Sequence, residues 1–107
     1  MKLINILILL FVCPTILFSQ NEKIDITGTI LERHSQKPIE FATVMVGSKN
    51  TKEMITGCTT GVDGTFELET RIADFYVEIS FIGFINITIT DFTISDGKVN
   101  LGIIELN

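Results

Sequence analysis

Residues that could do acid–base or metal chemistry are few in this chain. His34 is the only histidine, and it stands in a polar stretch beside Glu32 and Arg33. A structural or catalytic zinc site needs three or four nitrogen and sulfur ligands at suitable spacing, and neither a second histidine nor a cysteine cluster is present. The sequence therefore predicts that His34 is a solvated loop residue, with no metal, no cofactor and no general base.

Asp63, Glu67 and Glu69 could be interpreted as a carboxylate cluster for calcium. Ca²⁺ takes six to eight oxygen ligands drawn from several positions, whereas these two glutamates alternate with Phe66 and Leu68. An alternating pattern puts the glutamates on the solvent-exposed face of a strand and the apolar pair on the opposite face. Calcium binding is therefore not predicted.

Nucleophilic catalysis has no better support. Serine and threonine fall mainly on outward strand positions, where β-propensity favours them, and the chain lacks a Gly-x-Ser-x-Gly nucleophile elbow. Cys58 lies in a strand-like stretch, which predicts a small buried hydrophobe and not a reactive thiol. We therefore expect a protein that is not an enzyme.

The elements that must position these residues are strands. The longest alternating stretch runs from residue 75 to residue 91, and Gly83 interrupts it. A period of two predicts two half-buried strands with a bend between them. The residues expected to face inward are Phe75, Val77, Ile79 and Phe81 on the first strand and Ile85, Ile87 and Ile89 on the second.

Shorter alternating stretches predict five more strands, at residues 24–32, 41–46, 54–60, 65–69 and 99–106. Gly28 takes an inward position in the first of these. Ala42, Val44 and Val46 share one face of the second. Because Asp63-Gly64 tolerates the backbone of a tight turn, strands 54–60 and 65–69 are predicted to pair as a hairpin. Seven short strands separated by turns predict an all-β, seven-stranded antiparallel sandwich with Greek-key connections.

The first twenty residues have the layout of a secretory signal peptide. Lys2 precedes an almost wholly apolar run from Leu3 to Val12, and Pro14 and the polar Ser19-Gln20 follow. The run is too short and too interrupted for a spanning helix, and Phe11-Val12 before Cys13 disfavours a lipoprotein. We expect cleavage near the Ser19–Gln20 bond, a domain over residues 21–107, no remaining transmembrane segment, and export to the periplasm or outer membrane.

The charge of the exported chain limits its possible partners, and its cysteine content limits its possible disulfides. The whole chain carries 8 basic and 13 acidic side chains, and removal of residues 1–20 takes away only Lys2, so the formal net charge moves from −5 to −6. An acidic surface repels phosphate backbones, which excludes nucleic acid as a partner. Cys58 is left without a second cysteine, so no internal disulfide is expected.

Four stretches in order resemble a known family: Gly28-Thr29-Ile30, residues 37–44 (Lys-Pro-Ile-Glu-Phe-Ala-Thr-Val), residues 60–66 (Thr-Gly-Val-Asp-Gly-Thr-Phe) and residues 80–84 (Ser-Phe-Ile-Gly-Phe). The chain is similar over residues 24–106 to the carboxypeptidase-regulatory-like domain, a seven-stranded sandwich of transthyretin-like or prealbumin-like shape. Gly61 departs from the family's usual Asp or Asn, which implies a missing side-chain tie in that loop. The resemblance implies structural roles for Gly28, Pro38, Ala42, Val44, Asp63, Gly64, Phe66, Gly83 and Phe84.

In Bacteroidetes-type bacteria, proteins of this kind carry the domain directly after the signal peptide and before the plug and barrel of a TonB-dependent outer-membrane receptor. The chain stops at Asn107, so we expect a truncated receptor product or a free-standing copy. The resemblance implies a non-catalytic accessory or interaction domain, most simply a monomer, whose partner is a receptor or another envelope protein. The alternative is a free-standing sandwich that binds a carbohydrate or small ligand, for which Tyr76, on the outward phase of its strand, is the one plausible contact.

Overall fold

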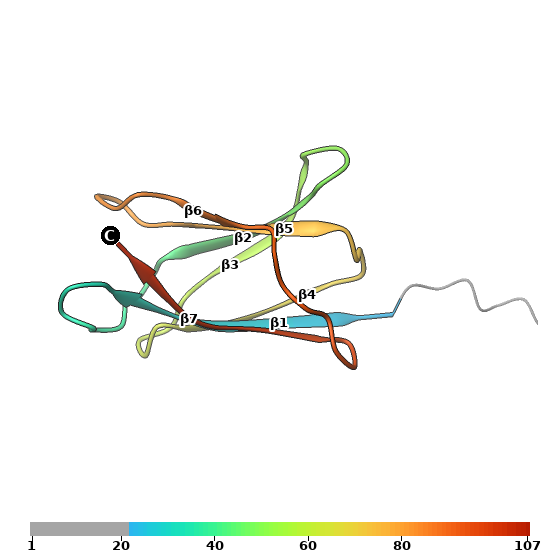
Figure 1. Ribbon diagram of the computed structural model, residues 1–107. Helices are drawn as coiled ribbons and strands as arrows, with labels where there is room; N and C mark the ends of the chain where they lie inside the picture. The colour runs from blue at the N-terminus through green and yellow to red at the C-terminus, as the bar shows by residue number, and fades with distance from the viewer. Residues whose placement is uncertain (1–21) are drawn as a thin grey trace, which may run out of the picture.

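Seven strands form two packed layers in the computed structural model, which describes residues 22–107 (Figure 1). The expected signal peptide and Asn21 lie outside the described residues. None of residues 22–107 belongs to a helix long and apolar enough to cross a membrane. The strands are β1 (Ile24–Glu32), β2 (Thr43–Ser48), β3 (Met54–Thr59), β4 (Thr65–Thr70), β5 (Phe75–Ser80), β6 (Ile87–Ile89) and β7 (Lys98–Leu106).

The strands divide into a three-stranded sheet in the order β4-β1-β7 and a four-stranded sheet in the order β3-β2-β5-β6. This confirms the all-β sandwich with seven strands. Four of the strand pairings are antiparallel, as expected, but β1 and β7 run parallel. The expectation of a purely antiparallel sandwich is corrected for that pair, because β7 enters its sheet from the opposite layer and reaches β1 from the same end.

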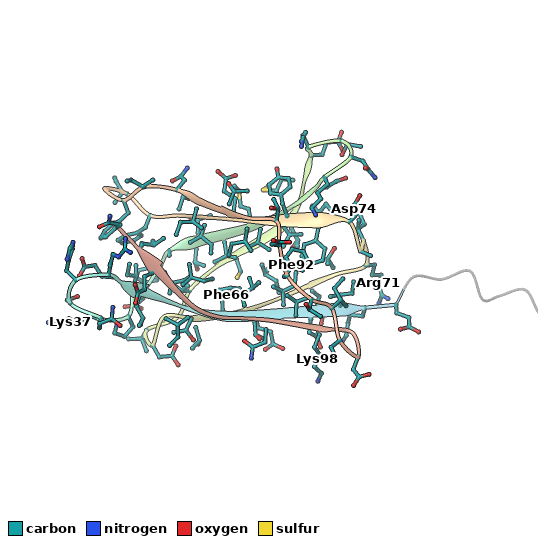
Figure 2. The ribbon with its side chains drawn as sticks, in the orientation of Figure 1. Lys37, Phe66, Arg71, Asp74, Phe92 and Lys98 are labelled. Atoms are coloured by element: carbon teal, nitrogen blue, oxygen red, sulfur yellow. The ribbon has the colours of Figure 1, made fainter. Side chains whose placement is uncertain are left out.

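The core lies between the layers and follows the two-residue period. Phe75, Val77 and Ile79 of β5 are fully buried, as are Val44 and Val46 of β2. Each such side chain contributes about 1.5–3 kcal/mol when it leaves water. Phe66 points between the layers, whereas Lys98 points outward from the three-stranded sheet (Figure 2).

The predicted hairpin between strands 54–60 and 65–69 is wrong. Thr59 at the end of β3 pairs with Thr43 of β2, whereas Thr65 at the start of β4 pairs with Thr29 of β1. The turn between them therefore carries the chain from one sheet to the other. Alternation correctly placed an apolar face on both strands, but a sandwich buries two such faces equally well when they lie in opposite layers.

The turn is fixed to β1 by Gly64. Its φ is +79°, and its carbonyl accepts the Ile30 N–H at 2.8 Å. A Cβ at this position would lie 2.6 Å from the Ile30 carbonyl oxygen, so only glycine permits this close approach. This close contact between Gly64 and Ile30 directs β4 onto β1 and away from β3.

Two further differences from the predicted inward and outward positions occur next to glycines. The Phe84 N–H donates to the Phe81 carbonyl at 3.0 Å across a tight turn in which Gly83 has a φ of +87°. Pairing resumes only at Ile87, which leaves Ile85 outside β6 and 70% exposed, contrary to the expected inward position. Ile87 and Ile89 are half-buried.

In β7 a bulge at Leu101-Gly102 opposes Gly28 alone, between the pairs Thr27–Asn100 and Thr29–Ile103. Gly102 takes a φ of +72° there. The alternation of Val99, Leu101 and Ile103 predicts that all three share one phase, but beyond the bulge the inward positions are Ile104 and Leu106, and Ile103 faces solvent.

Candidate binding surfaces

Five of the nine residues to which the family resemblance gives structural roles are buried: Gly28, Ala42, Val44, Gly64 and Phe66. Ala42 and Val44 are fully buried. Gly28 and Phe66 are direct neighbours across β1 and β4, and a Cβ on Gly28 would lie 2.7 Å from Cζ of Phe66. The glycine thus lets the ring lie on the backbone of β1. These contacts give the residues packing roles and no access to a ligand.

Asp63 acts within its own turn. Its Oδ1 accepts the Thr65 hydroxyl at 2.7 Å and the Thr65 N–H at 3.2 Å, and these hydrogen bonds hold the pKa of Asp63 below its ordinary value. Asp63 therefore ties the loop, although Gly61 itself supplies no side-chain hydrogen bond. Glu69 forms a surface ion pair with Lys23 at 3.5 Å. No group of three or more metal-ligand side chains occurs within residues 22–107.

His34 lies in an exposed turn together with Glu32. The Glu32 carboxylate accepts the N–H of Ser35 at 2.8 Å and the N–H of His34 at 3.4 Å. Hydrogen bonds from Ser35, first its side chain and then its backbone, lower the pKa of Glu32. Pro38 follows, bridged to Leu31 at the end of β1. This arrangement is a self-contained turn, and the imidazole has no acidic partner inside a cleft.

Cys58 is half-buried on the inward phase of β3. Burial raises the pKa of its thiol, and the Glu67 backbone N–H opposes this shift by hydrogen bonding. A thiol with a raised pKa carries little thiolate at neutral pH. The residue therefore behaves as a packing group.

Tyr76 packs on the outer surface of the four-stranded sheet. It is paired with Gly47 across β2 and β5, and a Cβ on Gly47 would lie 2.5 Å from Cζ of the tyrosine. The ring covers the glycine and is itself half-buried. Tyr76 therefore has a packing role along one side of its ring while its other side faces solvent.

The strands around Tyr76 present few charges on their outer surface, and the Lys49–Asp74 ion pair lies just beyond the ends of β2 and β5. The outward side chains come from β2, β3, β5 and β6, and Glu78 is the one ionisable carboxylate among them. We call this surface the neutral face; it consists of Thr43, Met45, Gly47, Met54, Gly57, Thr59, Tyr76, Glu78, Ser80 and Thr88.

A hollow of about 520 Å³ opens where the neutral face meets the Gly83 turn. Phe41, Ile82 and Phe84 line it together with Thr43, Ser80 and Asn86. Phe41 is 67% exposed at a φ of +68°, just before β2, and not inside a strand that began at residue 41 as predicted. The sequence analysis missed Phe41 as a surface residue, although its alternation with Ala42 and Val44 already placed it on the opposite phase.

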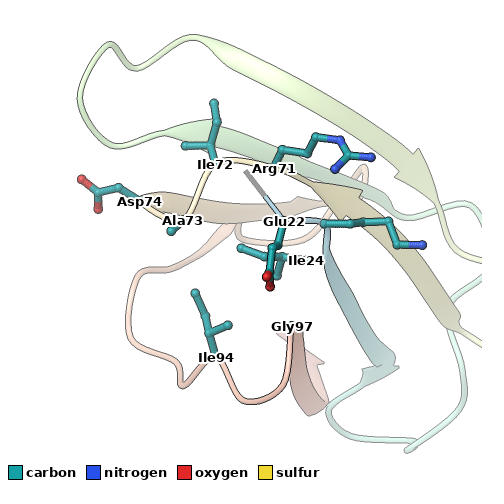
Figure 3. Close-up of a pocket in the computed structure, with 9 residues that line it drawn as sticks. Glu22, Ile24, Arg71, Ile72, Ala73, Asp74, Ile94 and Gly97 are labelled. Carbon is teal, nitrogen blue, oxygen red and sulfur yellow. The ribbon is translucent and has the colours of Figure 1, made fainter. Parts of the chain in front are cut away.

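A second hollow, of about 500 Å³, lies at the opposite end of the sandwich (Figure 3). Ile24, Ile72 and Ile94 give it an apolar lining, with Glu22 and Asp74 at its margin. Figure 3 shows the Asp74 carboxylate pointing away from Ile24. Lys23 and Arg71 line this hollow as well.

The solved structures that resemble this fold are distant in sequence. The dioxygenase domain of a dioxygenase and carbohydrate-binding protein fusion from Streptomyces sp. SirexAA-E is 12% identical, with a TM-score of 0.58 over 81% of this chain and 82% of that one. The major plantain pollen allergen is 16% identical, with a TM-score of 0.51 over 79% and 93% of the two chains. The pilus 2b backbone protein of group B streptococcus is 18% identical, with a TM-score of 0.50 over 78% and 40%.

These likenesses establish the fold, a sandwich of the transthyretin-like or prealbumin-like kind. Among curated proteins, none matches the sequence. The sequence itself matches the carboxypeptidase regulatory-like domain over residues 25–106. Because this match spans most of the sequence, the chain belongs to the carboxypeptidase regulatory-like domain family.

Proposed function

We propose that this chain is a non-catalytic interaction domain that is exported and binds another envelope protein beside a TonB-dependent outer-membrane receptor. The family description, a regulatory-like domain, supports a role without catalysis. The groups that might have done chemistry have structural explanations: Asp63 ties a turn, Glu32 closes another, and Cys58 packs. The observation that carries the proposal is the free edge of β3.

The edge of β3 is open and carries no charge. β2 is the only strand paired with it in a backbone ladder within residues 22–107, and the Cys58 side chain is hydrogen-bonded by the Glu67 backbone of β4. The strand reads Met-Ile-Thr-Gly-Cys-Thr, without proline or a charged residue, and Met54 is 64% exposed. Monomeric proteins usually protect such an edge with lysine, proline or a cover, because its unpaired backbone groups are a template for another strand.

The other sheet edges are less suited to this role. β4 carries Glu67 and Glu69, β6 has three residues, and β7 is interrupted by its bulge. On β3, by contrast, the pairs from Thr43–Thr59 to Val46–Thr56 are regular, and the irregularity is confined to Ile55. The regular part spans four residues, which fits a short added strand.

The hydrogen-bond pattern shows which groups a partner strand would meet. The Thr60 N–H donates to the Ala42 carbonyl at 3.0 Å. Because bonded and non-bonded pairs alternate in an antiparallel ladder, the backbone N–H and C=O of Thr59 and Gly57 turn to the free side. A strand that docks here would bond to these two residues.

The test places a photo-crosslinking residue in the full chain, expressed in a bacterium with a TonB-dependent receptor. One probe replaces Met54 on β3, and a matched probe replaces Ile103, which is 66% exposed on the opposite sheet. We expect an adduct with an envelope protein from position 54 and none from position 103. The substitution Thr59→Pro should abolish the adduct because it removes an outward N–H, while Thr59→Ala should retain it.

Equal adducts from both positions, or an adduct that survives Thr59→Pro, would contradict docking at β3. An amide spectrum of each variant establishes that the sandwich is intact. Sequencing the N-terminus of the purified protein checks export in the same preparation, since cleavage near Ser19 is expected.

A further inference from the structure

The neutral face offers a kind of binding chemistry that the β3 edge does not use. Thr59, Thr43 and Ser80 are successive partners across β3, β2 and β5, so their hydroxyls form a row on the outer surface. None of the three hydroxyls hydrogen-bonds another group among residues 22–107. Asn86 adds a side-chain amide at the margin of the hollow, and it is equally free of hydrogen bonds within the described chain.

We propose that the neutral face binds an uncharged oligosaccharide, with Phe41 at one end of the binding track and Tyr76 at the other. Hydroxyl and amide groups both donate and accept hydrogen bonds, which matches a ligand that is covered with hydroxyls. A purely apolar partner would leave the row unsatisfied, at a cost for each polar group removed from water.

The aromatic rings supply the second half of this chemistry. Phe41 is 67% exposed and stands over the hollow that Ser80 and Asn86 also line. The flat apolar side of a sugar ring stacks on such an aromatic face, while the equatorial hydroxyls reach the polar groups around it. Tyr76 presents the outer side of its ring in the same way.

Charge and length then define the ligand class. Glu78 is the one carboxylate of the neutral face, and the face has no lysine or arginine, so it offers nothing to phosphate, sulfate or uronic acid groups. Gly47, the partner of Tyr76, lies six positions after Phe41. At about 3.3 Å per residue of extended chain, the two backbone positions are at most roughly 20 Å apart. This length suits an oligosaccharide and exceeds a single sugar.

The experiment titrates the full chain, purified from its bacterial host, with neutral hexasaccharides from β-1,4-glucan, α-1,4-glucan, β-1,4-xylan and β-1,4-mannan. Hexagalacturonate serves as the anionic comparison. Amide resonances are followed by NMR up to millimolar sugar. We expect at least one neutral hexasaccharide to shift the amides of Thr43, Ser80 and Asn86, and hexagalacturonate to leave them in place.

Phe41→Ala should weaken that binding roughly ten-fold, the size expected for one aromatic contact. Ile103→Ala removes a side chain of equal exposure, 66%, from the opposite sheet and should leave the affinity unchanged. Both positions are on the surface, and the dispersion of the amide spectrum checks folding directly.

The proposal is overturned by the absence of shifts with all neutral sugars, by shifts confined to the three-stranded sheet, by binding of hexagalacturonate alone, or by equal effects of the two variants. A protein adduct that Phe41→Ala abolishes in the crosslinking experiment would likewise assign the face to a protein and not to a sugar. Because the crosslink is read at Met54, failure of the sugar titration leaves docking at β3 to be judged separately.

Discussion

The outer surfaces of the two sheets differ in charge although both sheets are built from the same alternation. On the three-stranded sheet the outward positions include Asp25, Glu67, Glu69 and Lys98, and Lys23 pairs with Glu69. On the four-stranded sheet the outward positions are uncharged except for Glu78. Charged residues keep a solvated face soluble and unpaired. The difference therefore leaves the four-stranded sheet with the less charged outer surface, which is the surface that both proposals use.

The same contrast recurs in two glycine–aromatic pairs. Gly28 with Phe66 joins β1 to β4 on the core side, and Gly47 with Tyr76 joins β2 to β5 on the solvent side. Each ring covers the backbone of a glycine directly opposite it. One pair belongs to the stability of the fold and the other borders a surface, so equal substitutions should have unequal effects.

The largest expected effect is that of Phe66→Ala. The ring is 6% exposed in the middle of the core, and its removal should cost about 3–5 kcal/mol of unfolding free energy. Tyr76→Ala, on the half-buried ring, should cost about 1–2 kcal/mol. Urea denaturation of both variants measures the difference. A Tyr76 effect as large as the Phe66 effect would show that the outer ring is as much a core residue as the inner one.

Gly28→Ala and Gly47→Ala sharpen the comparison at the backbone. A Cβ on Gly28 meets Phe66 at 2.7 Å, and that ring is enclosed by the core. A Cβ on Gly47 meets Tyr76 at 2.5 Å, but this ring can swing toward solvent. We expect a loss of about 1–3 kcal/mol for Gly28→Ala and less than about 1 kcal/mol for Gly47→Ala. Thermal unfolding of the two variants side by side tests the order, and a reversal would contradict it.

The inward and outward phases of most strands could be predicted from the sequence, but the layer to which a strand belongs could not. Phe66 and Leu68 were expected inward and are buried, yet nothing in their spacing distinguishes pairing with β3 from pairing with β1. That choice depends on Gly64, whose carbonyl accepts the Ile30 N–H, and a contact between residues so far apart in sequence has no local pattern.

The positions where alternation failed follow glycines. Ile85 comes after the Gly83 turn and Ile103 after the Gly102 bulge, and both are exposed. A glycine in a strand warns of a bulge or bend without giving its length. Phe41 differs from these cases, since its outward phase was visible beside Ala42 and Val44. Its importance depends on the hollow formed with the distant Gly83 turn.

The smallest expected effect concerns Asp63, in the turn that joins the two sheets. Its pKa is lowered by hydrogen bonds from Thr65, so the ionised carboxylate stabilises the folded state at pH values above the unfolded pKa of about 3.9. This contribution is lost as the pH falls through the lower, folded-state pKa. Wild type should therefore be more stable than Asp63→Asn near neutral pH, and the difference should shrink in acid below about pH 4. Unfolding free energies of the two proteins across this pH range measure the difference, and the similar response of Glu32 cancels because both proteins contain that residue.

In a Thr65→Val background the pH-dependent difference should shrink to the part that the Thr65 N–H supplies. A difference that is undiminished there would show that the Thr65 hydroxyl does not contribute to it.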